Sequence, residues 1–170
     1  QGSEFFDDKI SELMINLSKN YKISLIQQVI DEDKKKTLKE KYEQIKLEND
    51  LFSFNQEIFK KYSNVDLAIT RSGASTISEL IYFKIPFIAI PLPRSKDNHQ
   101  FYNAKNYHDK KLCWIVNQKD YNQENLKEFI LNIIQNPENY FEKKNNMSEF
   151  SYQNTWNNIN QKILTLINEN

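Results

Sequence analysis

Cysteine, glycine and long apolar runs are all scarce in this chain of 170 residues. Its single cysteine, Cys113, excludes an internal disulfide framework and lies in the apolar run LCWIV, which predicts a small core residue. No apolar stretch approaches the roughly 20 residues that cross a bilayer, and the N-terminus lacks the pattern of a secretory signal. We therefore expect a cytoplasmic protein without a transmembrane segment.

An excess of charge of one sign is also missing. Lys plus Arg and Asp plus Glu each total 23, so the formal net charge is zero. A polyanion is normally held by a basic field, and we therefore expect no nucleic-acid partner. The two histidines, His99 and His108, are not spaced with Cys or carboxylates as zinc ligands, and no Ser-His-Asp arrangement is present. We expect neither a metal nor a cofactor.

Helical and strand patterns alternate along the chain. Apolar residues recur at helical spacing from Phe6 to Leu17. Strands are predicted at 22–29, 51–54, 65–70, 86–92 and 112–117. Between them, helices are predicted at 31–46, 57–62, 71–84 and 100–110, the first of them a solvated surface helix. This alternation predicts a doubly wound α/β fold with a parallel sheet, because each crossover helix covers the sheet to which it returns.

The tail, residues 122–170, carries helical patterns and no strand. One segment begins at Gln123 and another lies between Trp156 and Ile167, with Pro137 separating them. Neither a linker nor an internal repeat appears, so the chain reads as one domain with a helical tail.

Gly73 is one of only two glycines and lies between a predicted strand and a predicted helix. Ligands of doubly wound folds bind at the carboxyl ends of strands. A glycine there permits a positive φ or the close approach of a ligand, and the following helix presents free N–H groups. With Ser72, Ser75 and Thr76, this pattern indicates a phosphate cradle that needs no metal. Glu79, one helical turn further, could accept hydrogen bonds from ribose hydroxyls.

A purely structural interpretation of the same turn remains open. Ser72 or Ser75 could cap the helix, Glu79 could complete a capping box, and Gly73 could only make the turn. Neither a full GxGxxG nor a P-loop is present. The spacing alone does not choose between a cap and a phosphate site.

The loop at 91–105 gathers polar side chains at the start of the next helix. They are Asp97, Asn98, His99, Gln100 and Asn103. Donors and acceptors concentrated in this way fit the hydroxyls of a sugar. The alternative for Asp97 or Asn98 is a helix N-cap. His99 and Gln100 would then be an exposed loop residue and an ordinary first-turn residue.

Two segments, DLAITRSGASTISEL and PFIAIPLPRSKDNHQFYNA, resemble the donor-binding domain of the MurG-type glycosyltransferases. The resemblance runs from Gln1 to about Asn117, and more loosely through the tail. It implies the Rossmann-like C-terminal half of a two-domain GT-B fold. It also implies an inverting, metal-independent hexosyltransferase that moves N-acetylglucosamine from UDP-N-acetylglucosamine to lipid I in peptidoglycan synthesis.

The resemblance implies which residues bind the UDP-sugar donor. They are Asn55, Arg71, Ser72, Gly73, Ala74, Ser75, Thr76, Ile77, Ser78, Glu79, Asp97, Asn98, His99 and Gln100. The helix N-terminus at 74–76 would meet the diphosphate of the leaving UDP, and Glu79 the ribose. Residues 97–100 would contact the sugar, although some members carry glutamine where His99 stands. The backbone at Asn55 would contact uracil. No catalytic residue is assigned on this chain.

Members of that family carry a GGSQGA loop after the first strand of this domain. Of that loop only Gln1 and Gly2 remain here, and Ser3 stands in place of the final Ala. The resemblance implies that a central strand and a whole acceptor-binding domain precede the chain. Residues 1–170 would then be a donor-binding domain that is incomplete at its N-terminus and inactive alone. The full protein would be peripheral at the inner face of the plasma membrane, meeting its lipid-linked acceptor through the absent domain.

Two other functions remain open. The chain could be a subunit of another split GT-B transferase, or a non-catalytic module that binds UDP or a partner. An epimerase is disfavoured, because only Asp97 and His99 could serve as its acid and base near the sugar.

Overall fold

The computed structural model describes residues 3–55, 57–93, 95–153 and 165. It divides into two compact units, residues 1–61 with 121–131 and residues 62–120 with 132–170. The helical segment predicted between Trp156 and Ile167 lies, apart from Thr165, outside the described residues.

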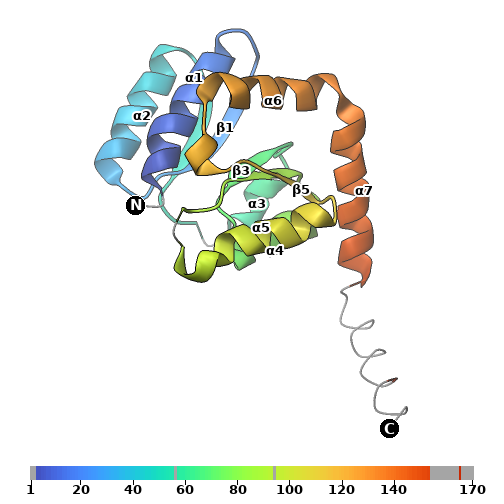
Figure 1. Cartoon of the computed structure of the whole chain (residues 1–170). Helices are drawn as coiled ribbons and strands as arrows, with labels where there is room; N and C mark the ends of the chain where they lie inside the picture. Colours follow the sequence, from blue (N-terminus) through green and yellow to red (C-terminus); the bar gives the residue numbers. More distant parts are fainter. Residues whose placement is uncertain (1–2, 56, 94, 154–164, 166–170) are drawn as a thin grey trace. The chain divides into compact units, whose positions relative to one another are not determined.

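The first unit contains two parallel strands and the helices that precede and connect them (Figure 1). Its elements are the π-helical turn η1 (Phe6–Ile10), α1 (Ser11–Ser18), β1 (Ser24–Gln28), α2 (Glu32–Gln44) and β2 (Glu48–Phe52). The strands pair in register from Ser24 with Glu48 to Gln28 with Phe52. The predicted strand 51–54 therefore begins earlier, at Glu48.

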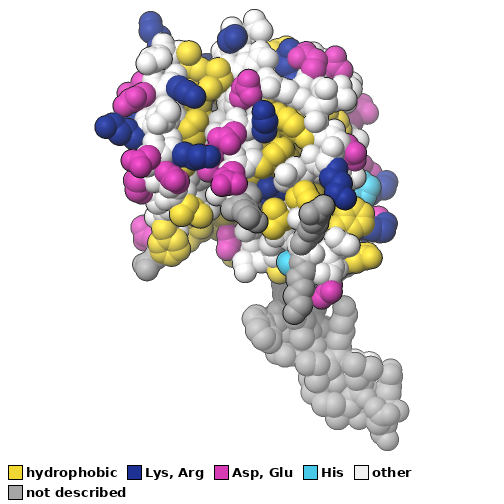
Figure 2. Space-filling model, turned by 60° about the vertical axis from the view of Figure 1, so that its left-hand side comes forward, with side chains coloured by type: hydrophobic (Ala, Val, Ile, Leu, Met, Phe, Trp, Pro, Cys, Tyr) yellow, Lys and Arg dark blue, Asp and Glu magenta, His cyan; other side chains and the backbone are white. Residues whose placement is uncertain are grey.

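Helix α2 is the solvated surface helix that its charge run predicts. Asp31 caps it, because its carboxylate accepts a hydrogen bond from the N–H of Lys34 at 2.9 Å. Only Leu38 and Tyr42 are buried within it, and they pack with Val29 and Leu47 in a small core. On the face shown in Figure 2, basic and acidic side chains intermingle. This agrees with the absence of an overall basic field.

The second unit contains a three-stranded parallel sheet. Its strands, in the order in which they pair, are β3 (Ala68–Thr70), β4 (Phe87–Ala89) and β5 (Cys113–Ile115). Its helical elements are α4 (Ala74–Tyr82), η2 (Lys96–Asn98), α5 (His99–Asp109), η3 (Gln118–Asp120) and α7 (Pro137–Gln153). Helices α3 (Phe59–Tyr62) and α6 (Gln123–Gln135) each have residues in both units. In Figure 1, α4 and α5 lie on the same side of this sheet, as two successive right-handed crossovers require.

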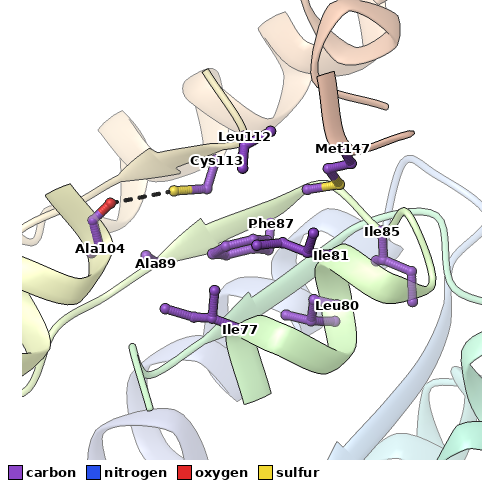
Figure 3. Packing of buried hydrophobic residues seen from close by; sticks show 10 residues of the cluster. All are labelled: Ile77, Leu80, Ile81, Ile85, Phe87, Ala89, Ala104, Leu112, Cys113 and Met147. Carbon is purple, nitrogen blue, oxygen red and sulfur yellow. Dashed lines mark hydrogen bonds between the residues drawn. The ribbon is translucent and has the colours of Figure 1, made fainter. Parts of the chain in front are cut away.

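The core of the second unit forms around β4, all of whose residues are buried. In Figure 3, the apolar face of α4 lies against Phe87, and Met147 approaches from α7. Cys113 is buried in this cluster, with its thiol 3.7 Å from the carbonyl oxygen of Ala104. Burial raises the pKa of that thiol to about 12. The prediction that Cys113 is a core residue is confirmed.

The parallel α/β class is confirmed, but the described strands form two sheets and not one. Pro137 lies after α6 and occupies the first position of α7, where its missing N–H costs nothing. Helix α7 lies between the two helical segments predicted for the tail, and the second of these is outside the described residues apart from Thr165. The central strand that the resemblance implies stays a prediction.

Candidate functional site

The two loops that the sequence singles out lie next to each other in the second unit. One joins β3 to α4 and the other joins β4 to α5, so both leave the carboxyl edge of the same parallel sheet. The Asn103 side-chain N–H donates a hydrogen bond to the backbone oxygen of Ser72 at 3.2 Å. This bond ties α5 to the turn before α4. One ligand of ordinary size can therefore contact both loops.

Helix α4 begins without a side-chain cap. Gly73 is its N-cap residue, and the first helical hydrogen bond runs from the N–H of Ile77 to the oxygen of Gly73 at 3.0 Å. The N–H groups of residues 74–76 therefore have no partner inside the helix. Ala74 and Ser75 are exposed. The interpretation of Ser72 or Ser75 as a cap, with Glu79 in a capping box, is wrong.

Gly73 does not have the positive φ that its position suggested. Its φ is −68° and its ψ is 138°, an extended conformation open to any residue. A Cβ atom placed there would meet only the Thr76 hydroxyl, at 3.9 Å, which is ordinary contact. The backbone therefore does not require glycine here. The second reason given for a glycine, the close approach of a ligand to the backbone, stays a prediction.

Ser72 is fully buried, so its hydroxyl is not presented to solvent at the helix N-terminus. Its Oγ has no hydrogen-bond partner among the described residues. A buried hydroxyl without a partner costs about 1–3 kcal/mol. Of the three hydroxyl residues in this turn, Ser75 and Thr76 are the ones whose side chains reach the surface.

Arg71 joins the ends of the strands beneath this turn. Its guanidinium donates to the backbone oxygen of Ile90 at 3.0 Å and to the side-chain oxygen of Gln118 at 2.7 Å. Burial lowers the pKa of Arg71 from its usual value. Arg71 thus connects the carboxyl end of β3 to the end of β4 and to the turn after β5. Gln118 carries no local sequence signal, since it lies 47 residues from Arg71.

The second loop enters α5 through two consecutive left-handed residues. Asp97 and Asn98 both have φ near 53°, and Asn98 is the N-cap residue without a side-chain cap bond. Neither acts as the side-chain cap that was the alternative. Both are exposed, as is His99. Gln100 is half-buried, and its side-chain oxygen accepts a hydrogen bond from the N–H of Leu92 at 3.0 Å.

Glu79 already has a partner within the protein. The Tyr62 hydroxyl donates to Oε2 of Glu79 at 2.8 Å. Burial, and then this bond to a carboxylate, raise the pKa of Tyr62 well above its usual value. Sequence reasoning placed Tyr62 only at the end of a short helix, because 17 residues separate it from Glu79.

Asn55 belongs to the first unit. Its side-chain oxygen accepts a hydrogen bond from the N–H of Glu57 at 2.8 Å, so the side chain is used within the turn. The expected uracil contact uses backbone groups and is unaffected by this bond.

In the part of the chain that the structure describes, no group of three or more His, Cys, Asp or Glu side chains is placed to hold a metal ion. None of the described helices is both long and apolar enough to cross a membrane.

A parallel α/β sheet with an uncapped helix N-terminus and a polar second loop at its carboxyl edge has the arrangement in which doubly wound domains bind their ligands. The chain matches the glycosyltransferase family 28 C-terminal domain over residues 1–159, and it belongs to that family.

Two relatives of the chain carry the same enzyme name. This chain is 45% identical to the UDP-N-acetylglucosamine--N-acetylmuramyl-(pentapeptide) pyrophosphoryl-undecaprenol N-acetylglucosamine transferase of Pelagibacter ubique. The match covers all of this chain and 48% of that protein. The protein of the same name from Rickettsia felis is 39% identical over 81% of this chain and 39% of its own length. The crystal structure of Acinetobacter baumannii MurG has the same fold, with a TM-score of 0.74 and 22% identity over 87% of this chain and 42% of that one. The chain thus spans about half the length of its relatives.

Proposed function

We propose that this chain is the donor-binding part of an inverting glycosyltransferase that moves N-acetylglucosamine from UDP-N-acetylglucosamine to lipid I in peptidoglycan synthesis. The observation that carries the proposal is the uncapped N-terminus of α4, held beside the polar loop before α5 by the bond from Asn103 to Ser72. Family membership and the names of the relatives support the same activity.

The N–H groups of residues 74–76 would receive the diphosphate. They are already oriented by the helix, and the positive end of the helix dipole adds to their attraction for phosphate oxygens. Negative charge grows on the leaving UDP as its bond to the sugar breaks. Donors fixed before the reaction stabilise that charge without reorganising, which is the main contribution that this part of the enzyme can make to the rate.

The remaining donor contacts divide by chemistry. Oε1 of Glu79 would accept from the ribose hydroxyls, and the exposed residues 97–99 would contact the N-acetylglucosamine. The side-chain oxygen of Gln100 is used by Leu92, so its amide N–H groups are left to donate to a sugar hydroxyl. Uracil would meet the backbone at Asn55.

We further propose that a strand and an acceptor-binding domain precede residue 1 in the whole protein. The described strands β1 and β3 each pair on one edge only, and an unpaired strand edge leaves backbone N–H and C=O groups without partners. A strand that precedes residue 1 would supply partners for such an edge. The preceding domain would carry the acceptor site and the contact with the inner face of the plasma membrane, and this chain alone would not turn over.

Titration calorimetry with UDP, UDP-N-acetylglucosamine and UDP-glucose tests the proposal on the whole protein. We expect the two UDP-sugars to differ in affinity, with UDP-N-acetylglucosamine the tighter. Equal affinities for all three ligands would contradict the role of residues 97–100. No binding of UDP would favour the alternative of a module that binds another partner, and binding without transfer in an assay with lipid I would favour a non-catalytic UDP-binding protein.

A further inference from the structure

We propose that Tyr62 is a positioning residue for ribose recognition, which holds Oε2 of Glu79 so that Oε1 is the oxygen offered to the ribose hydroxyls. The proposal deepens the function proposed above and rests on it. It concerns a residue that belongs to neither of the two recognised loops.

The Tyr62 side chain is itself fixed. Its ring packs against the core cluster of the second unit and meets the ring of Phe83 edge-on, with centroids 5.2 Å apart. Phe83 follows Glu79 by one helical turn, so Tyr62 contacts the end of α4 at two points, a ring and a carboxylate. A hydroxyl on a ring held in this way is a stationary donor.

The Tyr62–Glu79 bond has one donor and one acceptor. The phenol of Tyr62 donates and Oε2 of Glu79 accepts. Because burial and the carboxylate raise the pKa of Tyr62, the phenol keeps its proton and remains a donor throughout the physiological range of pH. No other side chain in the described part of the chain hydrogen bonds to Glu79. Its second oxygen, Oε1, is therefore left to accept a hydrogen bond from a ligand.

Fixing Glu79 before the ligand arrives favours binding. A free glutamate side chain has three torsions, and ordering them on binding opposes the association. With Oε2 already held, the ligand has less side-chain freedom to remove. The benefit applies only to ligands whose ribose hydroxyls use Oε1, and this separates positioning from a general contribution to folding.

Calorimetry of Tyr62→Phe with UDP and with 2′,3′-dideoxy-UDP tests the proposal on the whole protein. The analogue keeps the uracil and the diphosphate but lacks the hydroxyls. We expect Tyr62→Phe to weaken UDP by about twofold to tenfold, the worth of one hydrogen bond, and to leave 2′,3′-dideoxy-UDP unchanged. In a Glu79→Ala background, the same substitution should have no further effect on UDP.

Tyr140→Phe is the matched control. Tyr140 also lies in the second unit and its hydroxyl donates to the backbone oxygen of Asp66 at 3.0 Å, so the control removes an equivalent bond away from Glu79. UDP affinity should not change. Phenylalanine fills the space of tyrosine, and a melting curve of each variant checks that the fold is kept.

Three results would overturn the proposal. Equal losses for UDP and 2′,3′-dideoxy-UDP in Tyr62→Phe would show a structural role only, as would a loss that persists in the Glu79→Ala background. A wild-type protein that binds both ligands equally would remove the ribose contact itself. Failure of the wild type to bind UDP at all would instead contradict the proposed function, so the two failures are distinguishable.

Discussion

The backbone does not require glycine at position 73, and the proposed approach of a diphosphate would account for it. The φ of Gly73 is negative and a Cβ would meet nothing closer than 3.9 Å. We expect Gly73→Ala to change the free energy of unfolding by less than about 1 kcal/mol, because the lost freedom of the unfolded chain and the poorer N-cap offset each other. UDP affinity should fall by about tenfold, since the new methyl group lies where the phosphate approaches. Urea denaturation and calorimetry on the same sample measure both, and an unchanged affinity would contradict the close-approach interpretation.

Asp7 is a residue whose burial has a cost. It is only 4% exposed, and its Oδ1 has no hydrogen-bond partner in the described part of the chain. Burial raises its pKa, partly opposed by the charge of Lys34. A carboxyl with a folded pKa above its unfolded value destabilises the fold at neutral pH, and the penalty disappears as the pH falls through the folded pKa.

We therefore expect Asp7→Asn to stabilise the protein by about 1 kcal/mol near pH 7, with the gain shrinking near pH 4. Urea denaturation at the two pH values measures it. Asp8→Asn is the control, because Asp8 is exposed and forms a surface ion pair with Lys34 at 3.2 Å, so its removal should change stability by less than about 1 kcal/mol. A gain that is the same at both pH values would show that charge is not the cause.

At the scale of the element, α4 allows a backbone donor to be removed by mutation. Ala74 is the first residue of the helix, where proline is tolerated, and Gly73 before it has the extended conformation that proline requires. We expect Ala74→Pro to remain folded while losing one of the three free N–H groups. UDP affinity should fall by about tenfold or more, the worth of a hydrogen bond to a charged group.

Ala74→Val is the matched control for that experiment, because it adds bulk at the same position and keeps the N–H. Calorimetry with UDP should show a much smaller loss for valine than for proline. Equal losses would mean that bulk near α4 matters and that the amide of residue 74 does not donate to the ligand.

The elements were largely predictable because each has a local cause. The apolar spacing at 77, 80 and 81 defines the buried face of α4, and the lone buried pair in α2 defines a surface helix. The boundaries of the elements were less predictable. Strand β2 includes Glu48 and Asn49, polar residues that no strand pattern predicts. Its extent is fixed by backbone hydrogen bonds to β1 and not by its side chains. The number of sheets depends on which strands pair, which is a non-local property.

The site divides in the same way. The free helix N-terminus and the polar loop were predictable, since both are sequence-local. The contacts that hold them were not: Arg71 with Gln118, Tyr62 with Glu79, and Asn103 with Ser72 join residues 17 to 47 positions apart. The left-handed backbone at Asp97 and Asn98 also escaped prediction, although these residue types tolerate it best among non-glycine residues.

At the scale of the whole molecule, the edges of β1 and β3 that have no partner among the described strands give a test of the proposed preceding strand. Alternate N–H groups of a strand point to opposite edges. Val29 and Ala68 donate toward β2 and β4, so the N–H groups of Ile26 and Ile69 point to the other edge. We expect hydrogen exchange at Ile26 and Ile69 to be fast in residues 1–170 alone and markedly slower in a protein that carries the proposed preceding strand. The amides of Val29 and Ala68 serve as internal controls and should be slow in both. Unchanged exchange at Ile26 and Ile69 would mean that no strand is added there.

The guanidinium of Arg71 has a consequence for how the site responds to temperature. Because Arg71 joins the ends of β3 and β4 and the turn after β5 in the folded chain, the backbone beneath the proposed phosphate position is assembled during folding, before a nucleotide would bind. We therefore expect warming to increase the motion of the exposed residues 97–99 at a lower temperature than that of the strand ends joined by Arg71. The difference in affinity between UDP-sugars should then shrink as the temperature rises, while the affinity for the diphosphate should persist until the domain melts.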